Sequence, residues 1–215
     1  ITDVTLEQVV AARKAGYVVK LLAICERLTD PATGVDGVSA RVHPALVPDS
    51  HPLAAVHGAN NAVFVEAEAA GPLMFYGAGA GGIQTASAVL GDVVSAARRH
   101  VVGGPGVAES THADLPVLPM SAVTTRYQIT LVVVDEPGVL AGIAALFQNH
   151  GVSVETVQQS VASRDAAGQP EATDAATLVI GTHAASEADL AATVAALTTS
   201  SVVHTVTSVL RVEGL

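Results

Sequence analysis

The order of apolar segments in the second half of the chain constrains the fold more strongly than any other sequence feature. Four segments have the β-branched, alternating pattern of strands, and two longer ones repeat apolar residues with the period of a helix. In order they are strand 126–134, helix 138–150, strand 152–162, strand 175–182, helix 186–198 and strand 202–212. This βαββαβ order predicts a ferredoxin-like domain, with two helices on one face of a four-stranded sheet.

The first half of the chain predicts helices mixed with antiparallel strands. Thr5 and Gln8 have the capping-box spacing at the start of a helix over 5–16. The apolar segment 17–29 and the alternating residues Val38, Ala40 and Val42 flank the turn sequence "PATGVDG" and predict a hairpin. The fold class is therefore α+β, with a mixed or antiparallel sheet in the first part.

A second antiparallel pair is expected from segments 61–68 and 72–76, which a short Ala-Gly-Pro break separates. The helix expected next, over 84–99, has one broad apolar face, formed by Ala86, Val89, Leu90, Val93, Val94 and Ala97.

Residues 101–125 concentrate Gly, Pro, Ser and Thr without periodicity, which indicates a domain boundary, part of which is expected to pack as an ordered arm. We place a first domain at 1–104, a linker at 105–125 and a second domain at 126–215. The polar loop 162–175 suggests no chemistry.

A glycine-rich stretch, "FYGAGAGG", has the spacing G-x-G-x-x-G at Gly77, Gly79 and Gly82. A dinucleotide-binding loop with this spacing opens a βαβ unit, so a second parallel strand and an acidic residue should follow the helix. Here the helix runs into Gly103 and Gly104, which disfavours that interpretation. Two others stay open: a turn that needs glycine for its backbone conformation, or a close approach of the backbone to a ligand at a helix N-terminus.

Composition excludes several classes of function. The formal net charge is −10 and aromatic residues make up 3%, so a nucleic-acid partner is not expected. The chain has no apolar run of about 20 residues, no signal-peptide pattern in "ITDVTLEQVV", and one cysteine, Cys25. We therefore expect a cytoplasmic protein without a membrane partner.

Metal and hydrolase chemistry are not expected either. The eight histidines, which include His43, His51, His57 and His204, have no metal-ligand spacing. No serine lies in a nucleophile-elbow sequence. The chain begins at Ile1 without an initiator Met, so we expect it to be a truncated or proteolysed part of a longer protein.

Three stretches together resemble a known family: "AGYVVKLLAI" (15–24), "VHPALVPDSHPLAAVHGANNAV" (42–63) and "FYGAGAGGIQTASAVLGDVVSAAR" (75–98). They resemble the carboxy-terminal half of the catalytic region of homoserine dehydrogenase, and the βαββαβ domain resembles the ACT regulatory domain of many bacterial members. The resemblance implies interconversion of L-aspartate 4-semialdehyde and L-homoserine with NADP or NAD, in threonine, methionine and isoleucine biosynthesis. It also implies a homodimer or homotetramer, with the cofactor bound mainly by an upstream domain.

The resemblance places the glycine-rich stretch at the nicotinamide end of the cofactor. It implies that Gly81, with Gly79 and Thr85 as weaker candidates, contacts the cofactor, whereas Gly77 and Gly82 are structural. One departure is Gln84, where bacterial relatives usually have Pro. Both residues are compatible with the first turn of a helix.

The catalytic lysine of the family lies in a G-x-D-x-x-x-K segment, and neither lysine of this chain, Lys14 or Lys20, has that context. We therefore assign no catalytic residue and expect this segment alone to be inactive. Lys20 lies in an apolar strand, where either a base with a lowered pKa or a packed stem with its ammonium at the surface is possible.

The segment "VVDEPGVLAGIAALF" (133–147) combines a strand, an acidic residue and a helix start. Free N–H groups at a helix N-terminus suit an amino-acid carboxylate, and an adjacent acid suits its ammonium. The candidate effector residues are Asp135, Gly138 and Leu140, and the resemblance implies L-threonine as effector. An ordinary helix start stays open, as does a non-catalytic amino-acid-sensing ACT module on a dimerisation scaffold.

Overall fold

A computed structural model describes residues 4–103, 113–161 and 175–214. The chain divides into two compact units, the first made of Ile1–Pro48 with Leu115–Leu215 and the second of Asp49–Asp114. These units differ from the sequence boundaries predicted at 104 and 126, because strands from the first 48 residues join the carboxy-terminal domain. The polar loop expected at 162–175 lies, except for its last residue, outside the described part of the chain.

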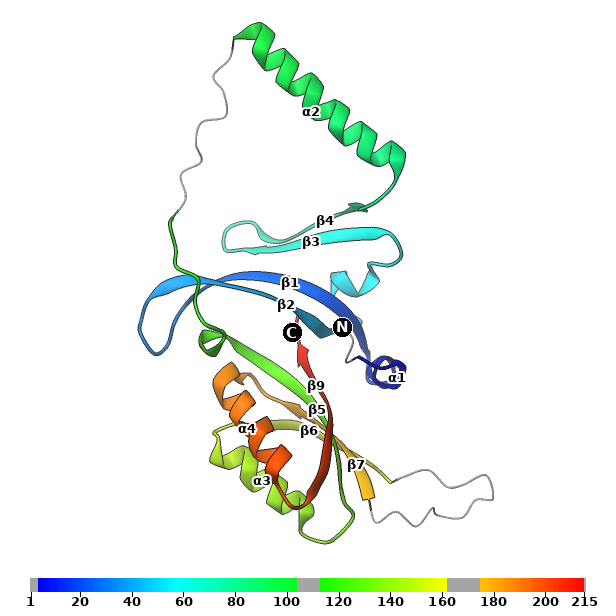
Figure 1. Ribbon diagram of the computed structural model, residues 1–215, viewed down its shortest axis with the longest axis vertical. Helices are drawn as coiled ribbons and strands as arrows, with labels where there is room; N and C mark the ends of the chain where they lie inside the picture. Colours follow the sequence, from blue (N-terminus) through cyan, green and yellow to red (C-terminus); the bar gives the residue numbers. More distant parts are fainter. Residues whose placement is uncertain (1–3, 104–112, 162–174, 215) are drawn as a thin grey trace, which may run out of the picture. The chain divides into compact units, whose positions relative to one another are not determined.

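The first unit contains a seven-stranded sheet in the order β1-β2-β9-β5-β7-β6, with the short β8 beside β5 (Figure 1). Its strands are β1 (Tyr17–Thr29), β2 (Asp36–Pro48), β5 (Thr124–Val134), β6 (Val154–Val161), β7 (Ala175–Thr182), β8 (Ala185–Ser186) and β9 (Val203–Val212). Its helices are α1 (Leu6–Lys14), α3 (Val139–Asn149) and α4 (Glu187–Thr199), with the 3-10 turn η2 (Met120–Ala122).

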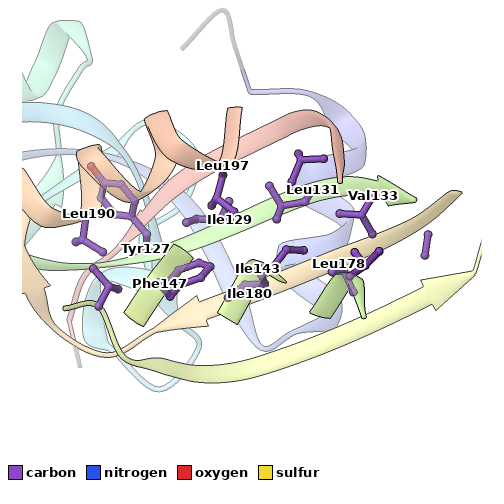
Figure 2. Packing of buried hydrophobic residues seen from close by; sticks show 14 residues of the cluster. Tyr127, Ile129, Leu131, Val133, Ile143, Phe147, Leu178, Ile180, Leu190 and Leu197 are labelled. Carbon is purple, nitrogen blue, oxygen red and sulfur yellow. The ribbon is translucent and has the colours of Figure 1, made fainter. Parts of the chain in front are cut away.

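The predicted βαββαβ domain is present as β5-α3-β6-β7-α4-β9, and it contains the main apolar core. Alternate residues of β5 and β7 point to one face of the sheet, where α3 and α4 cover them (Figure 2). The fully buried members include Ile129, Leu131, Leu178, Ile180, Phe147, Leu190 and Leu197. The strands and the amphipathic helices thus cover each other's apolar faces, since neither can bury its apolar face alone.

The amino-terminal elements also follow the sequence prediction. Thr5 accepts a hydrogen bond from the Gln8 N–H at 3.3 Å, and the Gln8 side chain accepts one from the Thr5 N–H at 2.9 Å, which completes the capping box at α1. Strands β1 and β2 form the expected antiparallel hairpin over their whole length. Part of the predicted linker is an ordered arm, because the Val38 N–H donates to Pro116 O at 2.9 Å and the Leu118 N–H donates to Val38 O at 2.8 Å.

Strand β2 buries three polar residues on one face. Ser39, Arg41 and His43 are buried, whereas Val42, on the opposite face, is 68% exposed. The alternation of apolar residues therefore correctly predicted a strand, but the face that packs into the first unit is the charged one.

The hairpin continues the ACT-like sheet through a short parallel pairing of β2 with β9. Only Ala45 with Arg211 and Leu46 with Val212 are in register, and the Glu213 N–H donates to Leu46 O at 3.0 Å. Side chains beside this short ladder must therefore contribute much of the connection.

The second unit contains the 3-10 turn η1 (Pro52–Ala55), the antiparallel pair β3 (Asn60–Ala67) and β4 (Gly71–Ala78), and the helix α2 (Gly82–Val102). Its two strands form a separate two-stranded sheet, as predicted. No residue of α2 is buried, and its apolar face is exposed, with Leu90 62% and Val93 57% accessible.

Candidate functional site

The glycine-rich stretch forms the connection between β4 and α2. The Gly79 N–H donates to Ala59 O at 3.0 Å and so extends the ladder by one bond beyond β4. Gly81 is the N-cap of α2, and its carbonyl accepts from the Thr85 N–H at 3.0 Å. Gly81 provides no side-chain cap, so the first turn of α2 has N–H groups available to an anion or a carbonyl.

Two of the glycines in this stretch have local constraints: the backbone conformation favours glycine at Gly81, and the Asn61 side chain lies where a side chain of residue 79 would sit. Gly81 has φ +141° and ψ 136°, a region essentially reserved for glycine, and a Cβ there would lie 2.1 Å from Gln84 Oε1. A Cβ at Gly79 would lie 1.7 Å from Asn61 Nδ2. At Gly77 and Gly82 a Cβ would meet nothing within 4 Å, and neither residue has a positive φ, so the described residues give no steric reason for glycine there.

The surroundings of this stretch exclude the dinucleotide-binding loop that its spacing matches. Strand β4 is antiparallel to β3, and α2 ends at Gly103 in the left-handed conformation. Within the described part of the second unit, residues 49–103 and 113–114, no parallel strand pair exists, whereas a βαβ unit requires one.

A second candidate site lies at the start of α3. A cavity of about 350 Å³ is lined by residues 133–140 together with Gln159 and Leu178. Gly138 is the N-cap of α3 with φ +97° and no side-chain cap, so the first-turn N–H groups of α3 face no capping side chain. The volume lies within the usual range of small-molecule sites.

The structure brings all three candidate effector residues, Asp135, Gly138 and Leu140, to this cavity. Gln159 Nε2 donates to Asp135 Oδ1 at 3.4 Å, which places an amide beside the carboxylate, and Leu140 is 47% exposed. Sequence reasoning missed Gln159 and Leu178, because they come from β6 and β7 and reach the site only through the sheet pairing.

A third group of polar residues lies where the hairpin meets the ACT-like domain, and we call it the polar seam. It consists of Arg41, His43, Tyr127, Glu187, Arg211 and Glu213. Sequence reasoning considered His43 only as a metal ligand and did not find the others. The signal available was the alternation of Ser39, Arg41 and His43 along β2.

On the side of the ACT-like domain, Glu187 at the start of α4 is the centre of the seam. Tyr127 Oη donates to Glu187 Oε1 at 2.7 Å, and Arg211 binds both carboxylate oxygens, its Nε donating to Oε2 at 3.3 Å. Burial and this hydrogen bond raise the pKa of Tyr127. Burial opposes the charge of Arg211, but the bond and charge of Glu187 raise its pKa. On this side of the seam, Glu187 thus accepts hydrogen bonds from both Tyr127 and Arg211.

On the hairpin side, Glu213 lies between two buried cations or potential cations. Its Oε1 is 3.7 Å from Arg41 Nη2 and 3.6 Å from His43 Nε2, both beyond a normal hydrogen bond. Arg41 Nη1 also donates to Glu26 Oε2 at 3.0 Å. Burial lowers the pKa of His43 and raises that of Glu213. Arg41 Nε, His43 Nε2 and Glu213 Oε1 are buried without a hydrogen-bond partner.

Three other features considered in the sequence are a base at Lys20, a metal site and a membrane-spanning helix. Burial lowers the pKa of Lys20, which is partly buried on β1, and nothing places it in either candidate site. Among the residues that the structure describes, no cluster of His, Cys, Asp and Glu has a metal-binding arrangement. In the same residues, no helix has both the length and the apolar character that a membrane crossing needs.

Comparison with known proteins identifies both halves of the chain. A sequence model described as homoserine dehydrogenase matches residues 1–94, and one described as ACT domain matches residues 127–199. Homoserine dehydrogenases of Corynebacterium glutamicum and Mycobacterium leprae are 49% and 52% identical over 99% and 100% of the chain. These matches cover 45% and 48% of the two relatives, so the chain spans less than half of their length.

A solved structure supports the same assignment. The crystal structure of a homoserine dehydrogenase from Thiobacillus denitrificans matches 99% of the chain and 46% of its own, with 33% identity and a TM-score of 0.82. The match includes both the α+β part and the ACT domain. The chain therefore belongs to the homoserine dehydrogenase family, of which it represents the carboxy-terminal region followed by an ACT domain.

Proposed function

We propose that the protein carrying this chain interconverts L-aspartate 4-semialdehyde and L-homoserine with NADP or NAD as cofactor. The observation that carries the proposal is the identity of about half the residues, along the entire chain, with proteins named homoserine dehydrogenase. In the oxidative direction, the terminal alcohol of L-homoserine gives a hydride to the nicotinamide ring and a proton to a base. We place that base and most of the cofactor site outside this chain.

The test is the activity of the whole protein. We expect the whole protein to reduce NADP⁺ or NAD⁺ in the presence of L-homoserine. The absorbance of the reduced nicotinamide measures this reaction. The 215-residue chain alone should be inactive, since neither Lys14 nor Lys20 lies in a G-x-D-x-x-x-K segment. Absence of turnover in the whole protein with either cofactor would overturn the proposal.

Within this chain, the start of α2 is the part that we assign to cofactor binding, through Gly81 with Gly79 and Thr85. The uncapped helix start and the exposure of Gly79 and Gly81 to solvent leave backbone accessible to a ligand. Gly81→Val in the whole protein should raise KM for the cofactor, because it adds bulk at this approach. Gly77→Ala, where a Cβ meets nothing within 4 Å, is the matched control and should behave as wild type. Equal kinetics for both variants would assign the stretch a purely structural role.

The ACT domain is proposed to bind an amino acid, L-threonine being the first candidate, in the cavity at the start of α3. The helix N-terminus would hold the carboxylate, Asp135 the ammonium, and Leu140 the side chain. Calorimetry with L-threonine should give binding that Asp135→Asn weakens and that Asp114→Asn, the same change at a residue that does not line the cavity, leaves unaltered. Binding of equal strength in both variants would remove Asp135 from the site.

A non-catalytic amino-acid-sensing module on a dimerisation scaffold is the second candidate function. It is favoured by the lack of a catalytic lysine segment in the chain. It predicts amino-acid binding without dehydrogenase activity in the whole protein, which the activity assay above distinguishes.

We also propose that the protein is a homodimer or homotetramer. The exposed apolar face of α2 and the open edges of the β3-β4 pair are surfaces of the kind that oligomers bury. Sedimentation of the whole protein at micromolar concentration should give a species larger than a monomer, and a monomer alone would contradict the proposal.

A further inference from the structure

The polar seam is where the homoserine dehydrogenase region and the ACT domain are joined. Their backbones pair at only two positions, Ala45 with Arg211 and Leu46 with Val212. Immediately beyond this pairing, Glu213 faces Arg41 and His43 of β2. The Arg41 and His43 side chains are at least nine-tenths buried, so water cannot readily replace Glu213 as their partner. The joint therefore depends on where Glu213 lies.

Strand β9, which ends at Val212 immediately before Glu213, begins beside the cavity of the ACT domain. The Val134 N–H of the cavity wall donates to Val202 O at 3.2 Å, and Val133 pairs with Val203 at the start of β9. Strand β9 then runs to Arg211 and Glu213 at the seam. A displacement of its first residues can therefore reach the seam along one element.

The pairing of β9 with β5 is irregular between these two ends. The register shifts between Thr130 and Leu131 and again between Val132 and Val133. Bulges of this kind leave residues outside the ladder and increase local twist. One such residue, Thr207, is held by side chains instead: its Oγ1 donates to Thr130 O at 3.1 Å, and its carbonyl accepts from Gln8 Nε2 at 3.4 Å. Beyond the bulges, Arg211 is hydrogen-bonded to Glu187, whereas Glu213 Oε1 forms longer ion pairs, at 3.7 Å with Arg41 and 3.6 Å with His43.

Glu213 thus has two nearby arrangements. Its Oε1 is 3.6–3.7 Å from both Arg41 Nη2 and His43 Nε2, and a movement of less than about 1 Å completes a hydrogen bond to one of them. Small shifts at one site become discrete changes elsewhere when a packed element has two such arrangements.

We propose that Glu213 is a positioning residue that couples the ACT domain to the β1-β2 hairpin, by shifting between Arg41 and His43 as β9 moves. The cause of that movement rests on the proposed binding of an amino acid in the α3 cavity. The coupling itself does not depend on that binding. Coupling is reciprocal, so a substitution in the hairpin must also change the stability of the ACT domain near the seam.

The first experiment tests this reverse direction without any ligand, by hydrogen exchange in the whole protein. Arg41→Met removes a partner of Glu213, and the readouts are the amides of Glu187 and Tyr127, which donate to Val123 O at 2.8 Å and to Thr182 Oγ1 at 3.0 Å. We expect both amides to exchange about tenfold faster or more, because breaking a buried charge pair is strongly destabilising. Arg41→Lys keeps the charge but loses the planar guanidinium, so it should give a smaller increase in the exchange rate of both amides. It replaces Arg41→Met in the experiment if that variant does not fold.

The matched control is Arg27→Met, on the same hairpin. Arg27 pairs with Asp36 at 3.6 Å, and both side chains are more than half exposed, so exchange at Glu187 and Tyr127 should remain as in wild type. If Arg41→Met and Arg41→Lys accelerate exchange only in β1 and β2, the coupling is refuted.

The second experiment adds L-threonine as the probe. Slower exchange is expected at Leu140, in the cavity, and at Leu46, in β2, and Glu213→Gln should abolish the effect at Leu46 while leaving that at Leu140. Protection of Leu140 with no change at Leu46 in wild type refutes the coupling. No protection of Leu140 refutes L-threonine as effector, and the ligand-free experiment then decides the coupling by itself.

Discussion

Substitution of Gly81 by alanine is the most direct test of the glycine-rich stretch. Its φ of +141° lies in a region that costs a residue with a Cβ about 1–3 kcal/mol. The added Cβ would lie 2.1 Å from Gln84 Oε1, so the Gln84 side chain must also move, at about 0.5–1.5 kcal/mol if it leaves a rotamer minimum. Together these effects should raise the free energy of the start of α2 by about 1.5–4.5 kcal/mol, which corresponds to roughly 13- to 2,000-fold in an opening equilibrium.

The assay is hydrogen exchange at the Thr85 amide, whose bond to Gly81 O closes the first turn of α2. Gly82→Ala is the matched control, since a Cβ there meets nothing within 4 Å and φ is not positive. It should stabilise the same turn by about 0.4–1 kcal/mol through the entropy of the unfolded chain. If Gly81→Ala and Gly82→Ala change exchange at Thr85 equally, the steric reasoning is refuted.

Three further outcomes are expected. Leu131→Ala, at 0% exposure in the ACT core, should cost about 2–5 kcal/mol in denaturant unfolding, whereas Val42→Ala, at 68% exposure, should cost under about 1 kcal/mol; similar losses would contradict the assigned core. Because burial lowers the pKa of His43 below 6.5, the unfolded state gains its proton first, so stability should fall as pH drops below about 6.5, and less so in His43→Asn. Thr5→Ala should destabilise α1 by about 1 kcal/mol, detectable as faster exchange at the Gln8 amide, and unchanged exchange would show that the capping box contributes nothing.

Much of the fold follows from local pattern, and the exceptions have a common physical origin. The strands and helices of the ACT domain repeat with periods of 2 and 3.6, so residues such as Ile129, Leu131 and Phe147 were recognisable as core from spacing alone. Which strand lies beside which is not a local property. The pairing of β2 with β9 involves two residue pairs at opposite ends of the chain, and no sequence signal marks it.

The candidate sites divide in the same way. Gly81 and Gly138 lie at the starts of α2 and α3 and both have a positive φ, while their roles in ligand binding stay predictions. Gln159 reaches the cavity from another strand, and Glu213 meets Arg41 across the β2-β9 joint. Hydropathy also misassigned the environment of β2, since Arg41 is buried by partners that only the folded sheet supplies.

The β2-β9 joint has a consequence for how the chain reaches its native state. Synthesis proceeds from the amino terminus, so Ala45 and Leu46 are made long before their partners Arg211 and Val212. Until residues 211–213 emerge, β2 is paired with β1 on one side only, and Arg41 and His43 lack the carboxylate of Glu213. Contacts so distant in sequence form slowly, because the loop must be closed before they are made. Completion of the sheet is therefore expected to be a late event that requires residues 211–213, and loss of Glu213 and its neighbours would leave the newly made hairpin exposed to pairing with other chains.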